Sequence, residues 1–351
     1  RILKELADVL ALPVAILSRR ILYEGCWPDR WRSHLLIPIY KKHSVYSAIN
    51  YRGIHLTTIM SKVVERTIGN PLITHLQSHG FGDQQWAFRK MSGARDLLTV
   101  CVSSWILAFC KGCKVGLYLG DITAAFDRVF KDLLMAKLVS AGVADIFLDF
   151  LSSYLEPRIG RVAVGGVLSD LIALDDMVFQ GTVLGPALWN IFFNSVVDAA
   201  SWHGGTPETF ADDLAVYKCF DKNVDNLIVV QNLRQTRLKV HNWGHRHRVE
   251  FDSTKEHVAI LHPSVGVGED FKYIGCQIDC YLRMNAAVDH IVSWARPKIK
   301  ALLRTRGTYD QKPCCNNTRH TSGEALNMQM VRSYMHVIQF LHALIASNNP
   351  F

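Results

Sequence analysis

The sequence lacks a hydrophobic run long enough to cross a membrane. Its longest nearly apolar stretch, residues 97–110, contains Ser and Thr and is only 14 residues long, whereas a spanning helix needs about 20 apolar residues. The chain also lacks a signal peptide at its start. We therefore predict an intracellular protein, nuclear or cytoplasmic, without a membrane partner. Because the first residue is Arg1 rather than Met, we expect the chain to be a piece of a longer protein.

Internal repeats and low-complexity tracts are also missing from the sequence. Over 351 residues, hydrophobic side chains make up 49% and charged side chains 20%. This composition excludes an intrinsically disordered or collagen-like chain, because it leaves ample apolar surface to bury. The length exceeds that of a typical domain, about 100–200 residues, so we predict two or three lobes around sizeable cores.

The cysteines do not form the pattern of a secreted, disulfide-stabilised protein. Nine cysteines are scattered along the chain, and an odd number in a long chain without a signal favours a reducing compartment. Two close groups are candidates for zinc, namely Cys110 with Cys113, and Cys314 and Cys315 with His320. A zinc site needs four ligands and no second CxxC completes either set, so buried or idle thiols are the favoured interpretation.

Positive charge exceeds negative charge and is concentrated in two stretches. The chain has 39 Lys and Arg against 31 Asp and Glu, which gives a net charge of +8. Residues 227–249 carry five Lys or Arg and no acid, and residues 291–320 carry seven against one acid. We predict that these stretches bind a phosphate backbone with release of counterions. A solvated helix face is the open alternative for each stretch.

Apolar periodicity predicts a mixed α+β fold with paired antiparallel strands. We predict strands at residues 34–40 and 114–120, and a strand pair within residues 209–217 that folds about Asp212 and Asp213. Pro13 interrupts the helical spacing of residues 2–24, which predicts two short helices there. Gly, Pro, Asn, Thr and Ser gather at residues 305–323, which we predict to be a linker.

Three carboxylates stand at the ends of apolar strands. Asp121 follows the strand in YLGDITAAFD, and Asp212 and Asp213 lie at the tip of FADDLAVY. Adjacent like charges repel each other, and a divalent cation that prefers oxygen ligands, Mg²⁺ or Mn²⁺, is the usual compensation. If the strands are neighbours in one sheet, the carboxylates converge on two ions about 3.5–4 Å apart, the arrangement for in-line phosphoryl transfer. For the Asp212–Asp213 pair alone, a type I turn or a helix N-cap stays open.

Short motifs follow one another along nearly the whole chain. They are WPDRW (27–31), LIPIYKK (36–42), NYRGIHL (50–56), SKVVE (61–65), QWAFR (85–89), DITAAFD (121–127), FQGTVLGP (179–186), FADD (210–213), Trp243, FDSTK (251–255) and FKYIG (271–275). In type, order and spacing this series resembles the reverse transcriptase of non-LTR (LINE-type) retrotransposons. Seven or more motifs in that order argue against a chance match.

The resemblance implies a right-hand polymerase of fingers, palm and thumb, with an antiparallel palm sheet flanked by helices. An N-terminal extension and the fingers would occupy residues 1–113. The palm would occupy residues 114–282, with a fingers insertion at about 129–176, and a truncated thumb residues 283–351. The implied activity is RNA-directed DNA polymerisation with two Mg²⁺ ions, or Mn²⁺ in their place. The implied partners are an RNA template, a DNA primer and dNTPs.

The resemblance also implies individual roles for motif residues. Asp121, Asp212 and Asp213 would hold the two ions, and Lys255 would protonate the leaving pyrophosphate. The nucleotide would be bound by Lys41, Arg52, Ile122, Phe126 and Gln180, the primer end by Tyr273 and Gly275, and the hybrid by Arg296, Lys298, Lys300, Arg304 and Arg306. Phe126 matches the bulky residue that excludes the ribose 2′-OH. Three alternatives stay open: Lys42 serves instead of Lys41, Phe126 is an ordinary core residue, and Lys255 is an exposed residue at a strand end.

The sequence departs from the family pattern at three positions. Phe179 replaces Pro before Gln180, Gly53 replaces Pro in the YRPI motif, and Asp252 replaces the usual Asn. Phe179 could re-aim the strand that positions Gln180. The departures at Phe179 and Gly53, with the start at Arg1, keep open a decayed or domesticated copy that binds nucleic acid without catalysis. Phe126 and the LINE-like order of the motifs disfavour an RNA polymerase. The family's endonuclease and zinc-knuckle segments are absent from these residues, so we expect an endonuclease elsewhere in the full-length protein.

Overall fold

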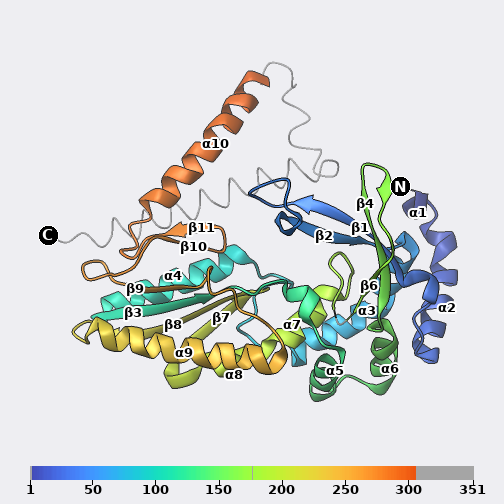
Figure 1. Ribbon diagram of the computed structural model, residues 1–351, viewed down its shortest axis with the longest axis horizontal. Helices are drawn as coiled ribbons and strands as arrows, with labels where there is room; N and C mark the ends of the chain where they lie inside the picture. The colour runs from blue at the N-terminus through green and yellow to red at the C-terminus, as the bar shows by residue number, and fades with distance from the viewer. Residues whose placement is uncertain (1, 176, 306–351) are drawn as a thin grey trace. The chain divides into compact units, whose positions relative to one another are not determined.

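The computed structural model describes residues 2–175 and 177–305 (Figure 1). By its internal contacts the chain divides into two compact units, Arg1–Gly268 and Glu269–Phe351, and each unit is considered by itself. The predicted domain limits after residues 113 and 282, and the predicted insertion between them, stay predictions. Of the predicted linker at residues 305–323, Thr305 is the last residue of a helix, and residues 306–323 lie outside the described residues.

The first unit mixes helices and strands, which confirms the predicted α+β fold class for the described residues. Its helices are α1 (Ile2–Glu5), α2 (Ala7–Glu24), α3 (Ile59–His79), α4 (Ala94–Cys110), α5 (Lys131–Ser140), α6 (Asp145–Tyr154), α7 (Gly185–Asn194), α8 (Val196–Ala200) and α9 (Asn226–His247). Its strands are β1 (Ser33–Tyr40), β2 (Tyr51–Leu56), β3 (Cys113–Gly120), β4 (Arg158–Val164), β5 (Val167–Leu168), β6 (Ile172–Leu174), β7 (Thr206–Phe210), β8 (Asp213–Asp221) and β9 (His257–Leu261).

A four-stranded antiparallel sheet has the order β7-β8-β3-β9. Its strand β3 is buried along nearly its whole length, because helices cover both faces of the sheet. On one face Trp105 of α4 packs against Tyr217 of β8, with ring centroids 6.3 Å apart. On the other face Gly116 lets α9 approach, since a Cβ at this glycine would lie 2.9 Å from Val229. Successive residues of a strand point to opposite faces, so the apolar run of β3 fits this two-sided burial.

The second sheet joins segments that are far apart in the sequence. Its order is β2-β1-β4-β5, and β6 pairs with β4. Strand β1 runs antiparallel to β2, which places Arg52 opposite Ile39, and parallel to β4. Close approach of β1 and β4 requires Gly160, because a Cβ there would lie 2.4 Å from the side chain of Leu36. The prediction of a strand at residues 34–40 is confirmed.

Helix α2 corrects one prediction. Pro13 predicts two short helices, but α2 runs without interruption from Ala7 to Glu24 with Pro13 inside it. A proline removes the hydrogen bond to the carbonyl four residues earlier, here that of Val9, whose residue is 72% exposed, so water can satisfy the carbonyl. Helix α2 packs on α3 and α6, and these tertiary contacts outweigh the local break.

A buried carboxylate ties α3 to the segment that precedes α7. Glu65 Oε1 accepts hydrogen bonds from the Tyr154 hydroxyl at 2.7 Å and from the backbone N–H groups of Val183 and Leu184 at 2.8 Å each. Burial raises the pKa of the Glu65 carboxyl. Backbone donors before a helix need such a partner when they are buried, so Glu65 holds the FQGTVLGP motif (179–186) in place.

The second unit begins with a hairpin of β10 (Phe271–Tyr273) and β11 (Cys276–Ile278), and α10 (Asn285–Thr305) follows. The carboxylate of Asp279 shapes the loop between them, because it accepts from the backbone N–H groups of Tyr281, Arg283 and Met284 at 2.7–3.1 Å. Of all the helices that the structure describes, none is both long and apolar enough to cross a membrane.

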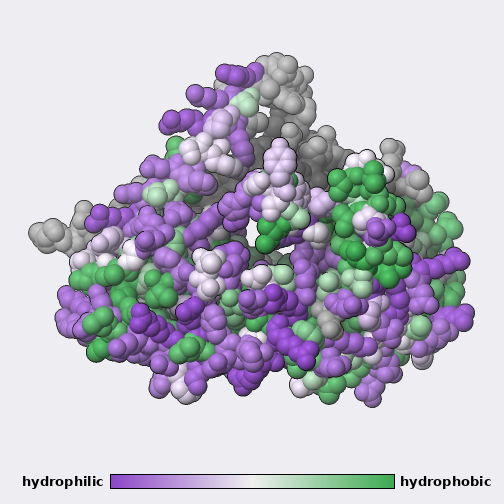
Figure 2. All heavy atoms as spheres, viewed as in Figure 1, coloured by the Kyte–Doolittle hydropathy of each residue, from purple (hydrophilic) through white to green (hydrophobic). Residues whose placement is uncertain are grey.

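Apolar side chains are exposed where β4 meets its neighbours β5 and β6. Figure 2 shows apolar atoms gathered over this part of the second sheet. The exposed residues are Val164, Val167, Leu168, Leu171 and Ile172. A group of this kind is typical of a surface that contacts another molecule or segment.

The anchor at Glu65 generates a stability prediction. We expect Glu65→Ala to lower the free energy of unfolding by about 2–4 kcal/mol, because it leaves two buried N–H groups and one buried hydroxyl without their acceptor. Glu65→Gln keeps an acceptor oxygen and should lose less than half as much. Chemical denaturation measures both. As the control, Glu24→Ala removes an exposed ion pair with Arg20 and should stay within about 0.5 kcal/mol of the wild type; an equal loss in both alanine variants would contradict the anchor.

Candidate functional site

Strand pairing brings the three predicted carboxylates to one end of the four-stranded sheet. Asp121 follows β3, Asp213 is the first residue of β8, and Gly120 pairs with Leu214. Because β3 and β8 are antiparallel, the end of one strand lies beside the start of the other. Asp212 lies in the turn between β7 and β8. The sheet therefore gathers residues that are about 90 positions apart in sequence.

The turn that carries Asp212 has an unusual backbone. Phe210 pairs with Asp213, so the hairpin loop is the dipeptide Ala211–Asp212. Ala211 has a φ of 56°, in the left-handed region that non-glycine residues rarely adopt. A type I turn needs a negative φ at this position. The alternative interpretation of the carboxylate pair as a type I turn is therefore wrong.

The carboxylates perturb one another's ionisation. Burial raises the pKa of Asp213 to about 6, and the neighbouring charges of Asp212 and Asp121 add to this effect. Burial also raises the pKa of Asp212, and Asp121 contributes in the same direction, while Arg52 and Lys255 oppose it. The site thus carries negative charge that the protein compensates only in part.

Lys255 is the nearest cation to Asp121 that the structure describes in an ion pair. Its Nζ lies 2.6 Å from Asp121 Oδ2 and 3.0 Å from Asp252 Oδ2. The Asp252 backbone N–H also donates to the carbonyl of Asp121 at 2.9 Å. Because position 252 is Asp rather than the family's Asn, Lys255 has a second carboxylate partner. Lys255 is exposed and lies in the turn two residues before β9, so the alternative of an exposed residue at a strand end stays open and its assigned role stays a prediction.

The residue after Lys255 is fixed by three side chains. Glu256 is buried and accepts from the Tyr118 hydroxyl at 2.6 Å, from Arg237 at 2.6 Å and from the His241 ring at 2.5 Å. Tyr118 belongs to β3, and the other two belong to α9. Lys255 is thereby held beside the end of β3. Sequence reasoning missed Glu256, whose only signal was its position next to FDSTK.

The donor set at this end of the sheet fits a divalent cation in its chemistry. Asp121, Asp212 and Asp213 offer only carboxylate oxygens, the ligands that Mg²⁺ and Mn²⁺ prefer, and their excess negative charge is what such an ion neutralises. Within residues 2–175 and 177–305, however, no group of three or more His, Cys, Asp or Glu side chains is arranged to hold a metal as the side chains stand. Asp121 would have to exchange Lys255 for the ion.

The cysteine candidates for zinc gain no support. In the described part of the chain, Cys110 and Cys113 are free thiols and belong to no metal-binding group. Cys314, Cys315 and His320 lie outside the described residues.

The predicted nucleotide-binding residues come from several elements around the carboxylates. Arg52 is exposed on β2 and acts electrostatically on Asp212. Lys41 is exposed just after β1 and acts on Asp127, whose pKa burial raises. Ile122 is buried and pairs through its backbone with Phe251. The roles assigned to these residues stay predictions.

Phe126 packs near the turn that carries Asp212. Its ring stacks on Trp189 of α7, with centroids 5.8 Å apart and planes 20° apart. Trp189 Nε1 donates to the carbonyl of Ala211 at 3.0 Å. Phe126 is only partly buried, so it lines the edge of the core and keeps a face toward solvent. Sequence reasoning missed Trp189, which links Phe126 to the turn.

Phe179, where the sequence departs from the family pattern, is closely packed. Phe179 is 2% exposed, its ring packs edge-on against His34 and His55, and the Arg158 guanidinium lies 4.0 Å above it. The next residue, Gln180, is half-buried, and its backbone carbonyl accepts from the His55 N–H at 3.0 Å. The Gln180 backbone is thereby held against β2. The glycine at position 53 pairs with Pro38 within the β1–β2 ladder, so it does not interrupt the strand.

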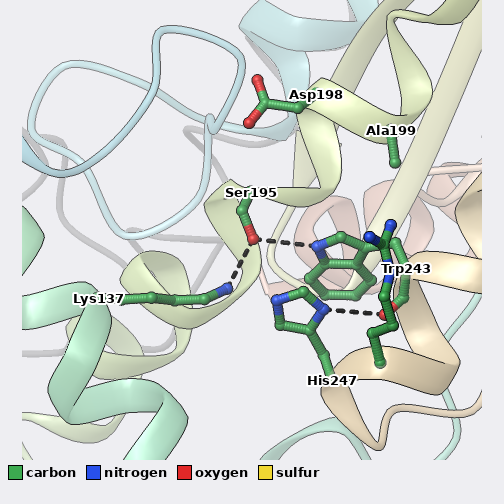
Figure 3. A pocket seen from close by; sticks show the side chains of 7 residues that line it. Lys137, Ser195, Asp198, Ala199, Trp243 and His247 are labelled. Atoms are coloured by element: carbon green, nitrogen blue, oxygen red, sulfur yellow. Dashed lines mark hydrogen bonds between the residues drawn. The ribbon is translucent and has the colours of Figure 1, made fainter.

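A pocket of about 460 Å³ lies between α5, α8 and α9 (Figure 3). Lys137 points toward Ser195 there and donates to its hydroxyl at 2.6 Å and to the carbonyl of Phe192, while Trp243 donates to the same hydroxyl at 3.0 Å. Burial lowers the pKa of Lys137 to about 8. None of the predicted site residues lines this pocket. Lys137 instead closes the C-terminal end of α7, where helix carbonyls lack partners.

The second unit carries the remaining predicted residues. Tyr273 is buried at the end of β10, and Gly275 follows it in the hairpin turn with a φ of 80°. The basic residues Arg296, Lys298, Lys300 and Arg304 are all exposed on α10. Arg306 lies outside the described residues.

Comparison with known proteins decides the family. The sequence profile of the family described as "Reverse transcriptase (RNA-dependent DNA polymerase)" matches residues 39–278. The chain belongs to this family. The predicted resemblance to the polymerases of non-LTR retrotransposons is thereby confirmed.

Relatives of this reverse transcriptase chain are mobile-element proteins. It is 26% identical over 320 residues to the RNA-directed DNA polymerase from mobile element jockey of Drosophila melanogaster. This match covers 85% of this chain and 34% of that protein. It is 30% identical over 223 residues to the probable RNA-directed DNA polymerase from transposon BS of the same organism, covering 60% of this chain and 24% of that protein. The chain therefore spans about a third or less of the length of these curated relatives.

A solved structure supports the fold alone. The apo telomerase from Candida tropicalis, truncated from its C-terminal domain, superposes with a TM-score of 0.51 at 13% sequence identity. The match covers 73% of this chain and 55% of that chain. The mixed α+β fold is thus similar to that of telomerase.

The raised pKa of Asp213 predicts a pH-dependent stability. Because the folded-state pKa of about 6 exceeds the ordinary value near 4, this group's contribution is fully present below about pH 4 and is lost as the pH rises through about 6. In EDTA we expect the free energy of unfolding to fall by up to about 3 kcal/mol over this range from this group. Urea titrations at several pH values measure it. Asp213→Asn should flatten the profile and Asp170→Asn, at an exposed loop carboxylate, should not; equal profiles in the two variants would contradict the assignment.

Proposed function

We propose that this chain is the polymerase part of a non-LTR retrotransposon protein, an RNA-directed DNA polymerase. Its substrates would be dNTPs, a DNA primer and an RNA template. The single observation that carries the proposal is the gathering of Asp121, Asp212 and Asp213 at one end of an antiparallel sheet, within the segment matched by the family profile. In this proposal the four-stranded sheet is the palm, the second sheet belongs to the fingers, and α10 belongs to the thumb.

The three carboxylates would hold two divalent ions, Mg²⁺ or Mn²⁺. When bound, the ions would supply activation of the primer 3′-OH and neutralisation of charge on the leaving group. The 3′-OH would give its proton to solvent water, the 3′-oxygen would form a bond to the α-phosphorus of the dNTP, the bond from that phosphorus to the oxygen bridging it to the β-phosphorus would break, and pyrophosphate would leave. The departing pyrophosphate would receive a proton from Nζ of Lys255, which would be released from its ion pair with Asp121 when the ion binds and would stay paired with Asp252 at this end of the sheet.

The neighbouring side chains would orient the nucleotide. Arg52 and Lys41 would meet the triphosphate, whose oxygens suit guanidinium and ammonium groups. Gln180 and the backbone at Ile122 would line the pocket, and the ring of Phe126 would lie under the sugar and exclude a 2′-OH. The exposed basic side chains of α10 would hold the hybrid through its phosphates without reading its sequence, and Tyr273 and Gly275 would seat the primer end. An endonuclease is expected elsewhere in the longer protein.

The rival function is a decayed or domesticated copy that binds nucleic acid without catalysis. Its support is the pair of departures at Phe179 and Gly53. Against it, Phe179 is buried against His34, His55 and Arg158. Gly53 keeps its strand pairing, and each of the three carboxylates proposed to bind metal is present. The polymerase is therefore the better-supported proposal.

Loss of one carboxylate separates the two functions. Asp212→Asn removes a charge while nearly preserving shape, so primer extension on an RNA template with dNTPs and Mg²⁺ should fall by about 10²–10⁴-fold, the equivalent of several kcal/mol of transition-state stabilisation. Hybrid binding should stay within about twofold. Asp170→Asn serves as the control, since its carboxylate is exposed in a loop. If wild type and Asp212→Asn are equally inert and both bind hybrid, the binding protein is the correct function.

The complementary variant acts on binding. Replacing Lys298, Lys300 and Arg304 together by Gln should raise the dissociation constant for hybrid and reduce its salt slope by up to about 3, roughly 1 per phosphate contact. Saturating template should restore much of the extension rate. Filter binding at several salt concentrations measures the slope, and an unchanged slope would remove α10 from the hybrid interface.

Phe126 generates a prediction on nucleotide choice. Phe126→Val should admit ribonucleotides while leaving dNTP use largely intact, because steric exclusion of one hydroxyl is the discriminating interaction. The ratio of kcat/KM for dNTP and rNTP should fall by about tenfold or more. Single-nucleotide incorporation measures this ratio. A variant that rejects ribonucleotides as strongly as the wild type would assign Phe126 to the core.

A further inference from the structure

The QWAFR motif (85–89) has no role in the proposed chemistry, yet it lies along the hairpin that carries the catalytic carboxylates. Gln85 forms an isolated parallel bridge with Thr209 of β7. The backbone carbonyl of Gln84 accepts from Thr209 N–H at 2.8 Å, and Trp86 N–H donates to the Thr209 carbonyl at 3.0 Å. The motif thus extends the sheet beyond β7 by a short pairing.

The side chain of Gln85 binds both backbone polar groups of Ala211. Gln85 Oε1 accepts from the Ala211 N–H at 3.0 Å, and Gln85 Nε2 donates to the Ala211 carbonyl at 3.4 Å. Gln85 is only 2% exposed, so these bonds form away from water, where an unmade bond is costly. Trp189 adds a second donor to the same carbonyl at 3.0 Å.

Ala211 is the residue whose conformation needs such a partner. Its φ of 56° is unfavourable for a residue with a Cβ, because the Cβ crowds the neighbouring backbone carbonyl oxygen. Asp212 follows directly, and Asp213 follows Asp212, so the dihedral angles of Ala211 set the direction in which both carboxylates leave the hairpin. A glycine here would adopt this φ without cost, but the chain has alanine.

Gln85 is itself held on several sides. Arg89 donates to the backbone carbonyls of Gly82 and Gln85 at 2.9 and 3.1 Å, which fixes the loop that carries Gln85. Asn190 of α7 donates to the Ala87 carbonyl at 2.9 Å, and the Ala87 N–H donates to Gln85 Oε1 at 3.0 Å. A side chain restrained in this way can impose a geometry on its partner instead of following it.

We propose that Gln85 is a positioning residue of the polymerase site, which holds Ala211 in its left-handed conformation and thereby aims Asp212 and Asp213. The inference rests on the proposed function. Gln85 does not contact the reacting groups and acts through the backbone of Ala211. The motif around it forms the frame in which this side chain is fixed.

The main experiment compares two neighbouring glutamines. Gln85→Met keeps the side-chain length and removes the hydrogen bonds, whereas Gln84→Met is the matched control, because the bonds of Gln84 to Thr209 come from its backbone carbonyl. We expect Gln85→Met to lower kcat by about 10–100-fold, as a displacement of about 1 Å at a reacting centre does. KM for dNTP should stay within about threefold, since the lost geometry acts in the transition state. Gln84→Met should match the wild type.

A second variant distinguishes positioning from general destabilisation. If Gln85 acts by holding the φ of Ala211, then Ala211→Gly in the Gln85→Met background should recover part of kcat, because glycine adopts that φ without a partner. A loss of packing around position 85 would not be repaired by glycine at position 211. No recovery in the double variant, or equal kcat in Gln85→Met and Gln84→Met, overturns the inference.

A readout without catalysis separates this inference from the proposed function. The dissociation constant for Mn²⁺, followed by electron paramagnetic resonance on the protein alone, should rise about tenfold in Gln85→Met and return toward the wild-type value in the double variant. This pattern supports the positioning role even if primer extension fails in the wild type, in which case the polymerase proposal falls alone. Equal Mn²⁺ affinity in wild type and Gln85→Met overturns the positioning role even if the wild type extends primers.

Discussion

The structure is organised around three partly buried carboxylates that lie together at one end of an antiparallel sheet. Asp121, Asp212 and Asp213 cannot separate, because strand pairing fixes the ends of β3 and β8 beside each other. Burial and mutual repulsion raise the pKa of Asp213 to about 6. A fold keeps such an arrangement only if other interactions offset its cost. Side chains around the site offset the negative charge or hold the carboxylates in place.

The restraints come from three directions. Lys255 supplies positive charge to Asp121, and the anchoring of Glu256 by β3 and α9 keeps Lys255 in place. Gln85 and Trp189 bind the backbone of Ala211 from two elements that are unrelated in sequence. Trp189 also stacks on Phe126. One indole therefore contacts both Phe126, which is proposed to select the sugar, and the turn that carries Asp212. A change at Trp189 would disturb both.

The environment of Phe179 explains how the chain accommodates a departure from its family. Arg158 donates to His34 Nε2 at 2.7 Å, so the proton of that ring is on Nδ1 and is donated to His55 Nδ1 at 3.0 Å. Burial, with the charge of Arg158, lowers the pKa of His34 to about 3 and that of His55 to about 4. Both rings are therefore neutral near pH 7 and pack against Phe179, while the guanidinium covers its face. The phenylalanine completes a buried cluster, and Gln180 beyond it keeps its bond to β2.

The fold class, the strand ends at Asp121 and Asp213, and the family could all be predicted from the residues, because apolar periodicity and motif order are local properties of the chain. The sequence could not reveal that Gln85 binds Ala211, which lies 126 residues away, or that Lys255 pairs with Asp121 across 134 residues. Such contacts depend on where the sheet and α7 bring separate segments. At Pro13 the local signal was misleading: the proline predicts a break, but packing of α2 on α3 and α6 keeps the helix continuous. Ionisation at the site was likewise decided by tertiary structure alone, because burial and the distances between charges exist only once the chain has folded.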